Sequence, residues 1–318
     1  MQPTRSFAWM FLAVMIGGTG VAGAQGYPNK PVRIVTVAPG GTPDLIARLI
    51  SQGVTGSLGQ PVIVDNRVGV VGIEIVSRAP ADGYTLAVNG QNLWILPLMQ
   101  PGTSYDPLKD FAPVSLVSRA PNVLVVHPSV PVRTVEELIA LAKAKPGTLN
   151  YGTGGPGSSN HLSGELFKAM SGANLVLINY KGTGASIIGL LAGEVQLMFA
   201  GLGPASPHIK AGKLRALAVT TAQPSALAPG LPPIASLLPG YESVVLTGMF
   251  APARTPVAII NRLNEEIVRV LARPDIRERL SNLGIEAVGS SPADFAALIR
   301  SEMSTMGKVI RDAGVRGG

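Results

Sequence analysis

The chain has 318 residues, of which 46% are hydrophobic and 14% are charged, and it contains no cysteine. This composition excludes an intrinsically disordered protein, and the lack of cysteine excludes disulfides, thiolate metal sites and cysteine nucleophiles. The formal charge is +7, but the basic residues are spread along the chain rather than gathered in a tract. Because a nucleic-acid-binding protein gathers its basic residues on one face, we expect no nucleic-acid partner.

The first predicted element is an export signal. Arg5 precedes the uncharged apolar run from Phe7 to Ile16, and Ala22-Gly23-Ala24 has the small residues of a cleavage site. A helix over that run would rise about 15 Å, which is half of a bilayer core, so a cleaved signal peptide is favoured over a membrane anchor. We expect residues 1–24 to be removed after Ala24 and the mature chain to reach the periplasm.

Strands and helices alternate in the next part of the chain. The β-branched run Pro31–Val37 predicts a buried strand, and Thr42-Pro43-Asp44 predicts a helix start with Thr42 as the N-cap. Two more strands are predicted at Pro61–Val64 and Tyr84–Val88, the second ending in the turn Asn89–Gln91. This alternation is typical of a mostly parallel α/β sheet.

A second α/β unit follows. Two successive apolar strands are predicted around 114–117 and 123–126, and Thr134 with Glu137 forms the capping box of a helix that ends near Lys145. Further strands are predicted at 149–151, 176–180, 195–200 and 214–220, helices from Ser158 or Ser159 and at 185–192, loops at 203–207 and 228–233, and C-terminal helices at 257–272, 274–283 and 292–311. No linker separates the units, so we expect two lobes joined by crossing strands.

Three strand-to-helix turns carry small polar residues: Pro39–Asp44, Gly152–His161 and Lys181–Ser186. A helix N-terminus has unpaired N–H groups and the positive end of the helix dipole, so it can bind a carboxylate or a phosphate. A single turn of this kind would indicate only a tight turn and not a binding site. Three turns at the carboxyl ends of strands favour an anion-binding cleft.

Other readings find little support in the residues. Gly152–Gly157 fits G-x-G-x-x-G, but no acidic residue follows about 20 residues later, which argues against a dinucleotide cofactor. The histidines, at 127, 161 and 208, lack metal-ligand spacing, and G-x-S-x-G is absent, so no metal, cofactor or catalytic residue is predicted. Glu265-Glu266 is expected on the surface, and Trp94 in the core or on a cavity wall. His161 could donate to an anion or be a buried polar residue.

Several segments along nearly the whole mature chain match one known protein family in their order and spacing. They are Tyr27–Val35, Ala38–Asp44 with Ala47-Arg48, Leu58–Val62, Asp65–Arg67, Asp82–Leu86, Tyr105–Val114, Gly157–Leu162, Tyr180–Gly182 and Pro207–Val219. With these segments the chain resembles the extracytoplasmic solute receptors of tripartite tricarboxylate transporters, also called Bordetella uptake gene (Bug) receptors.

The resemblance implies a two-lobed α/β periplasmic binding protein of the type II-like, Venus-flytrap kind, each lobe a mostly parallel sheet flanked by helices. Lobe 1 would comprise residues 25–122 and 246–318, and lobe 2 residues 123–245. Such a receptor closes around a small carboxylate and delivers it to membrane permease subunits. The implied ligand-binding residues are Pro39, Gly40, Gly41, Thr42, Pro43, Asp44, Asn89, Gln91, Gly154, Ser158, Ser159, His161, Thr183 and Ala200.

Two departures from the family pattern bear on the ligand. The stretch Val68–Gly72 is about three residues shorter than usual, which alters the rim of the first lobe. Ala200 stands where the family often has Asp or Asn, and an amino-acid ligand would need an acid there for its ammonium group. We therefore expect the ligand to be a dicarboxylate, a tricarboxylate or an aromatic carboxylate. We also expect the receptor to be a monomer and not an enzyme. A sensor domain for a membrane kinase and an exported enzyme on this fold stay open as alternatives.

Overall fold

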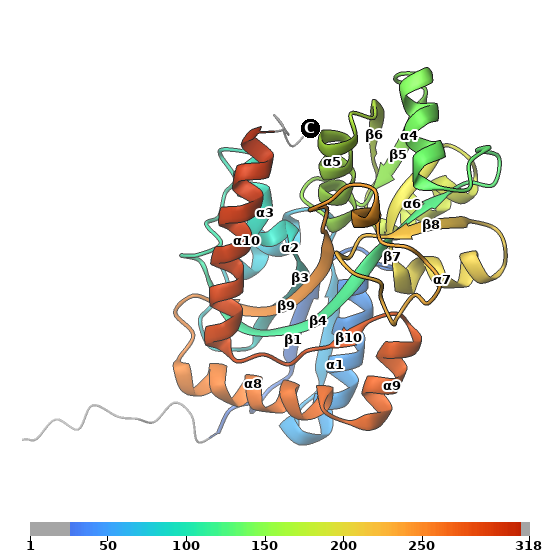
Figure 1. The fold of residues 1–318 in the computed structure, drawn as a ribbon. Helices are drawn as coiled ribbons and strands as arrows, with labels where there is room; N and C mark the ends of the chain where they lie inside the picture. The colour runs from blue at the N-terminus through green and yellow to red at the C-terminus, as the bar shows by residue number, and fades with distance from the viewer. Residues whose placement is uncertain (1–25, 313–318) are drawn as a thin grey trace, which may run out of the picture.

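The computed structural model describes residues 26–312. The chain forms two α/β lobes, and Figure 1 shows the second lobe, with β5 to β8, beside the first, with β1 to β3. This confirms the expected fold class. The predicted signal peptide, residues 1–24, lies outside the described residues.

The sheet of the first lobe has the strand order β2-β1-β3-β9-β4. Strands β1, β2 and β3 are parallel, with Val32 opposite Val62 and Arg33 opposite Thr85, whereas β9 is antiparallel to both β3 and β4. The bounds in this lobe are β1 Val32–Thr36, α1 Thr42–Leu58, β2 Val62–Asn66, α2 Val71–Ser77, β3 Thr85–Gly90, α3 Asn92–Met99, β9 Val244–Pro252, α8 Val257–Leu271, α9 Pro274–Asn282, β10 Glu286–Ala287 and α10 Pro292–Asp312.

The second lobe repeats the pattern. Strands β7, β5 and β6 are parallel neighbours, and β4 is antiparallel to β7 and β8. Each sheet is therefore mixed, because the strands that join the lobes run against the parallel set. The bounds are α4 Val135–Ala144, β5 Leu149–Thr153, α5 Ser159–Ser171, β6 Leu175–Asn179, α6 Thr183–Leu191, β7 Leu197–Gly201, α7 Leu202–Lys210, β8 Arg215–Val219 and the 3-10 turn Ile234–Ser236.

The strand β4, Phe111–Val126, belongs to both lobes. Its residue Pro121 pairs with Val244 of β9, and the next residue, Asn122, pairs with Gly201 of β7 in the other lobe. Figure 1 shows β4 and β9 as the long ribbons that run between the lobes. The prediction of two separate strands here was wrong: the buried polar residues Ser118 and Asn122 interrupt the apolar pattern, but the backbone stays extended through them.

Alternating side chains build one hydrophobic core on each face of each sheet. On β1, Val32 and Ile34 face the core under α1 and α8, while Val35 faces the core under α2, α3 and α10. On the second-lobe part of β4, Val123 and Leu124 point to opposite cores in the same way. Burying each such side chain stabilises the fold by about 1.5–3 kcal/mol. The strand-to-helix turns are thereby held at the sheet edges that face the other lobe.

Several local predictions were wrong in detail. Gly41, not Thr42, is the N-cap of α1. The predicted loop 203–207 is part of α7: Pro204 lies in the first turn, where a missing N–H removes no helical hydrogen bond, and the helix also accommodates Pro207 in its interior. No element was predicted for the segment after the Asn89–Gln91 turn, and Asn92–Met99 forms α3 there, with Pro97 inside it.

The adjacent glutamates of α8 differ in environment. Glu265 is exposed, as expected, but Glu266 is 1% exposed. Its carboxylate pairs with Arg262 at 3.0 Å and with Arg269 at 2.6 Å. The surface prediction was thus wrong for Glu266, since two arginines one turn away on either side neutralise the buried charge.

Candidate functional site

A cavity of about 260 Å³ lies between the two lobes. Its lining comes mainly from the turns that follow β1, β2 and β3 in the first lobe and β5, β6 and β7 in the second. In each of these turns the residue that caps the next helix lines the cavity. The six capping residues are Gly41, Val70, Gln91, Ser158, Gly182 and Gly201.

Five of the helices that begin at the cavity have eight residues or more: α1, α3, α5, α6 and α7. The first four N–H groups of a helix have no intrahelical acceptor, and the N-terminus carries about half a positive charge. The folding pattern that puts every helix after its strand therefore collects positive partial charge and hydrogen-bond donors around one space. This arrangement favours an anion.

The charged side chains around the cavity also favour an anion as the ligand. Among the lining residues of the described chain, Lys181 is the one that carries a formal charge, and no Asp or Glu lines the cavity. An ammonium group would find no carboxylate there, which extends the sequence argument made at Ala200. Across residues 26–312, no three His, Asp or Glu side chains come together as a metal site.

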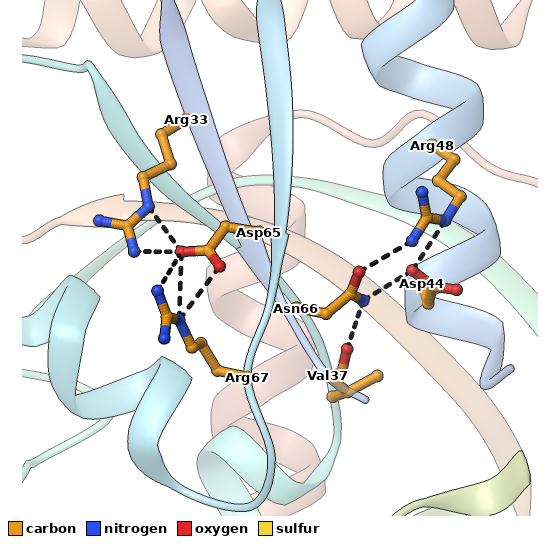
Figure 2. Close-up of polar contacts among 7 residues, drawn as sticks. All are labelled: Arg33, Val37, Asp44, Arg48, Asp65, Asn66 and Arg67. Carbon is orange, nitrogen blue, oxygen red and sulfur yellow. Dashed lines mark hydrogen bonds and ion pairs between the residues drawn. The ribbon is translucent and has the colours of Figure 1, made fainter. Parts of the chain in front are cut away.

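The turn after β1 is fixed by the carboxylate of Asp44. Asp44 accepts hydrogen bonds from the backbone N–H of Gly40 at 3.2 Å, from Arg48 Nε at 3.0 Å and from Asn66 Nδ2 at 2.7 Å. The same Asn66 nitrogen donates to the carbonyl oxygen of Val37 at 2.7 Å. Figure 2 shows the contacts that Asn66 makes with Asp44 and Val37, and the contact of Arg48 with Asp44. The Asp44 carboxylate thus positions the turn and does not line the cavity.

Arg33, Asp65 and Arg67 form a separate network on the neighbouring strands, also drawn in Figure 2. None of them lines the cavity. Burial alone would raise the pKa of Asp65, but hydrogen bonds from both arginines outweigh it and hold that pKa below its usual range. This network ties β1 to β2 and to the start of the rim Val68–Val70.

The turn after β5 is held by hydroxyl and amide groups. Ser158 Oγ donates to the carbonyl oxygen of Gly155 at 2.7 Å, and Thr183 Oγ1 donates to Asn160 Oδ1 at 3.2 Å. The second contact joins the start of α6 to the start of α5. Two of the helix N-termini in the second lobe are therefore linked to each other.

Glycines let the lobes approach closely. A Cβ atom on Gly184 would lie 3.0 Å from the Pro39 carbonyl oxygen, and one on Gly182 would lie 2.9 Å from the Ala38 Cβ. Nearer α3, a Cβ on Gly157 would lie 3.4 Å from the Cα atoms of Asn92 and Leu96. The turns of the two lobes therefore meet by backbone, and the cavity is closed on these sides.

The predicted site residues divide into two groups. Those that line the cavity are Gly41, Thr42, Pro43, Gln91, Gly154, Ser158, Ser159 and Thr183. Those that lie beside it without lining it are Pro39, Gly40, Asp44, Asn89, His161 and Ala200. Within the second group, Asn89 Oδ1 accepts from the Gly90 N–H and Ala200 is fully buried in β7.

His161 is 1% exposed, and its Nδ1 accepts a hydrogen bond from the Gly157 N–H at 3.2 Å. Burial lowers its pKa, so the ring stays neutral at neutral pH. Of the two readings left open by the sequence, the structure matches the buried polar residue: the ring holds the β5–α5 turn. Trp94 likewise fills the core and does not line the cavity.

The large apolar residues that line the cavity were not predicted from the sequence. They include Val68 and Val70 from the rim, Leu96 of α3, and Val245 and Leu246 of the crossing strand β9. The signal that could have found the rim is its place after β2, since each turn at a strand's carboxyl end faces the same space. Val245 and Leu246 carry no such signal, because apolar strand residues have the same sequence pattern whether they face a hydrophobic core or a cavity.

Comparison with known proteins gives matches over nearly the full length. Residues 46–315 match the model of the tripartite tricarboxylate transporter family receptor. Protein BugT of Bordetella pertussis is 34% identical, over 99% of this chain and 99% of its own. The structure of R. palustris Rpa4515 with adipate has a TM-score of 0.88 at 35% identity, covering 91% of this chain and 99% of the other. MatC (Rpa3494) from Rhodopseudomonas palustris with bound malate has a TM-score of 0.85 at 30% identity, covering 89% and 100%.

Proposed function

This chain belongs to the tripartite tricarboxylate transporter receptor family, and we propose that it captures a small carboxylate between its lobes and presents it to the membrane subunits of such a transporter. The observation that carries the proposal is the meeting of five helix N-termini at one cavity that no acidic side chain lines. Solved relatives hold adipate and malate, which are both dicarboxylates.

We propose that the carboxylate is bound at the cavity-lining residues of the β1–α1 and β5–α5 turns, namely Gly41, Thr42, Pro43, Gly154, Ser158 and Ser159. Backbone N–H groups at helix starts hold an anion without placing a counter-charge in the cavity. Gln91 and Thr183 would contact the rest of the ligand. Pro39, Gly40 and Asp44 would act by shaping the first turn.

We further propose that residues 25–122 and 246–318 move as one lobe and 123–245 as the other. The supporting observation is that β4 changes its sheet partner between Pro121 and Asn122. Closure about this point converts ligand binding into a shape that a permease can recognise. A monomer suffices, because both walls of the cavity come from one chain.

The periplasm is the proposed location, reached by cleavage after Ala24. No helix in the described part of the chain is long and apolar enough to cross a membrane. N-terminal sequencing of the protein recovered from an osmotic-shock fraction should read from Gln25. An uncleaved N-terminus in the membrane fraction would overturn this part of the proposal.

The test of function is a thermal-shift screen followed by calorimetry on the mature protein. A carboxylate at a hundredfold excess over its Kd should stabilise the protein by about 2.7 kcal/mol. Stabilisation by phosphates, sugars or amino acids without any carboxylate would overturn the proposal. Turnover of the bound carboxylate would point to an enzyme, and unimpaired uptake after deletion of the gene would point to a sensor.

A further inference from the structure

We infer that Glu302 is a positioning residue of the cavity, which holds Gln91 at the start of α3 and takes up a proton when an anionic ligand binds. The inference rests on the proposed function, because it takes the ligand to be an anion. It concerns a half-buried carboxyl group on the C-terminal helix α10, which lies outside the cavity lining and was not among the predicted site residues.

One hydrogen bond joins α10 to the wall of the cavity. Gln91 Nε2 donates to the Glu302 carboxylate at 3.0 Å, although 211 positions separate the two residues in the sequence. Gln91 is 5% exposed, lines the cavity and caps α3, and its backbone carbonyl oxygen accepts from the N–H groups of Trp94 and Ile95. A displacement of the Glu302 side chain would therefore shift the first turn of α3 where it borders the cavity.

The amide oxygen of Gln91 indicates which protonation state of Glu302 fits this contact. Gln91 Oε1 is buried and has no hydrogen-bond partner among the described residues. An ionised carboxylate only accepts, so it can pair with Nε2 but not with Oε1. A protonated carboxyl group accepts with one oxygen and donates with the other, and an amide can use both. Because an unpaired buried acceptor is destabilising, the contact favours the protonated form of Glu302.

The charged groups around Glu302 leave its carboxyl group without a cationic partner. The ion pairs of the described part of the chain do not include it. On α10 itself, no charged residue lies three or four positions away.

The elements packed against α10 add little charge near this group. Helix α3 carries no charged residue, β4 carries Arg119 alone, and the charged side chains of α8 are exposed or paired with one another. Arg119 and Glu242, which precedes β9, are both exposed and act on Glu302 in opposite directions. Burial is therefore the main influence, and it raises the pKa of Glu302.

An anion in the cavity would add to this preference. A ligand carboxylate repels an ionised Glu302 and not a protonated one, so binding of the ligand favours the protonated form. The coupling is reciprocal, because a ligand that raises the affinity of Glu302 for a proton is itself bound more tightly when the proton is present. Affinity should therefore increase as the pH falls from about 8 to about 5, with uptake of a fraction of a proton on binding.

Calorimetry on the mature protein tests the coupling, with adipate and malate as the first probes and the tightest carboxylate of the screen if neither binds. From about pH 5 to about pH 8 the wild type should lose about 3–10-fold in affinity relative to Glu302→Gln, whose amide offers a donor and an acceptor at every pH. Titrations in buffers of different ionisation enthalpy should show proton uptake by the wild type and none by Glu302→Gln. Using the same acid on both proteins cancels the titration of the acid.

Two further variants separate positioning from stability. Glu302→Ala should bind about 3–10-fold more weakly than Glu302→Gln at every pH, because Gln91 then has no partner on α10. The matched control is Glu286→Gln, on the exposed strand β10 and outside the cavity lining, which should keep the pH profile of the wild type.

The outcomes separate this inference from the proposed function. If the wild type and Glu302→Gln share one pH profile and one proton uptake, or if the alanine and glutamine variants bind equally well, the inference is wrong and the receptor function stands. If no carboxylate binds to the wild type at any pH, the proposed function itself fails.

Discussion

Gly184 of lobe 2 lies against Pro39 of lobe 1, so that a Cβ atom on Gly184 would come within 3.0 Å of the Pro39 carbonyl oxygen. Gly40 makes the same contact from the other side, where its own Cβ would lie 3.3 Å from the Gly184 Cα. Gly184 is in the first turn of α6 with ordinary helical backbone, so its lack of a side chain serves the contact between lobes and not the helix.

Gly184→Leu should weaken ligand binding without unfolding the protein. Leucine favours a helix by nearly 1 kcal/mol over glycine, but its side chain would hold the lobes apart. An overpacking penalty of about 1–3 kcal/mol in the closed form corresponds to roughly 5–150-fold in Kd. Calorimetry and thermal melting without ligand check both parts.

The control is Gly56→Leu, in the exposed part of α1, where an added Cβ meets nothing within 4 Å. It should raise the melting temperature and leave Kd unchanged. Equal Kd values for both variants would show that closure does not require bare backbone at Gly184.

Asp44→Ala should impair both binding and stability, because three donors lose their acceptor: the Gly40 N–H, Arg48 and Asn66. Hydrogen bonds to a charged group contribute about 1.5–3 kcal/mol each before relaxation, so we expect a destabilisation of about 2 kcal/mol. Affinity should fall about tenfold or more as the turn shifts.

Asp82→Ala is the comparison for that variant, since Asp82 lies outside the cavity lining and its more exposed carboxylate accepts from Lys30 and from the Tyr84 N–H. Its effect on stability should stay below about 1 kcal/mol, with unchanged affinity. If Asp44→Ala bound ligand like the wild type, Asp44 would not position the turn.

Glu266→Ala should destabilise the protein by about 1.5–3 kcal/mol, whereas Glu265→Ala should change stability by less than about 0.5 kcal/mol. Urea unfolding measures the difference, and neither variant should alter ligand affinity, because neither residue lines the cavity. Similar stability of the two variants would contradict the structural role of the Arg262–Glu266–Arg269 cluster.

The contribution of Glu266 to the stability of the protein should also depend on pH. Burial would raise its pKa, but the hydrogen bond from Arg269 and the charges of Arg262 and Arg269 hold that pKa below its ordinary value. A depressed pKa contributes stability above the unfolded-state pKa of about 4.3, and this contribution disappears as the pH falls through the folded-state value. The stability gap between wild type and Glu266→Ala should therefore shrink on acidification.

Glu302→Gln should show the opposite pH dependence. Burial raises the pKa of Glu302, and Glu242 adds to the shift, while Gln91 Nε2, which donates to its carboxylate at 3.0 Å, and Arg119 oppose it. The Glu302 carboxyl group therefore stays protonated to higher pH in the folded protein than in the unfolded chain. Stability falls as the pH rises from the unfolded-state pKa to the folded-state pKa. Glu302→Gln should be more stable than wild type at pH 7 and gain nothing below about pH 4.

Melting curves from pH 3.5 to pH 8 test this expectation, with Glu286→Gln on the exposed strand β10 as the comparison. A Glu302→Gln variant less stable than wild type at neutral pH would mean that the carboxylate is held ionised there. In that case its hydrogen bond with Gln91 would matter more than its burial.

Local patterns predicted most elements well. Thr134 and Glu137 predicted a helix start, and the Thr134 hydroxyl does accept the Glu137 N–H, at 3.2 Å. The three glycine-bearing turns all begin helices at the cavity, because a turn after a parallel strand must lie at the strand's carboxyl end. The prediction was weaker for Asp44 and His161, whose polar groups are used within the protein, since the sequence does not tell which atoms a polar side chain meets.

Local sequence patterns were enough to predict the alternation of strands and helices and the helix starts that favour an anion, because propensity, capping and periodicity act within a few residues. The composition alone excluded cysteine chemistry. The arginine partners of Glu266 lie on its own helix, but the burial of Glu266 depends on how α8 packs against the sheet. The three-dimensional structure was also needed to show which turns face each other and that Lys181 shares a cavity with Val68 and Val70. These depend on the path of β4 and β9 between the lobes, and contacts between segments more than 100 residues apart leave no local pattern.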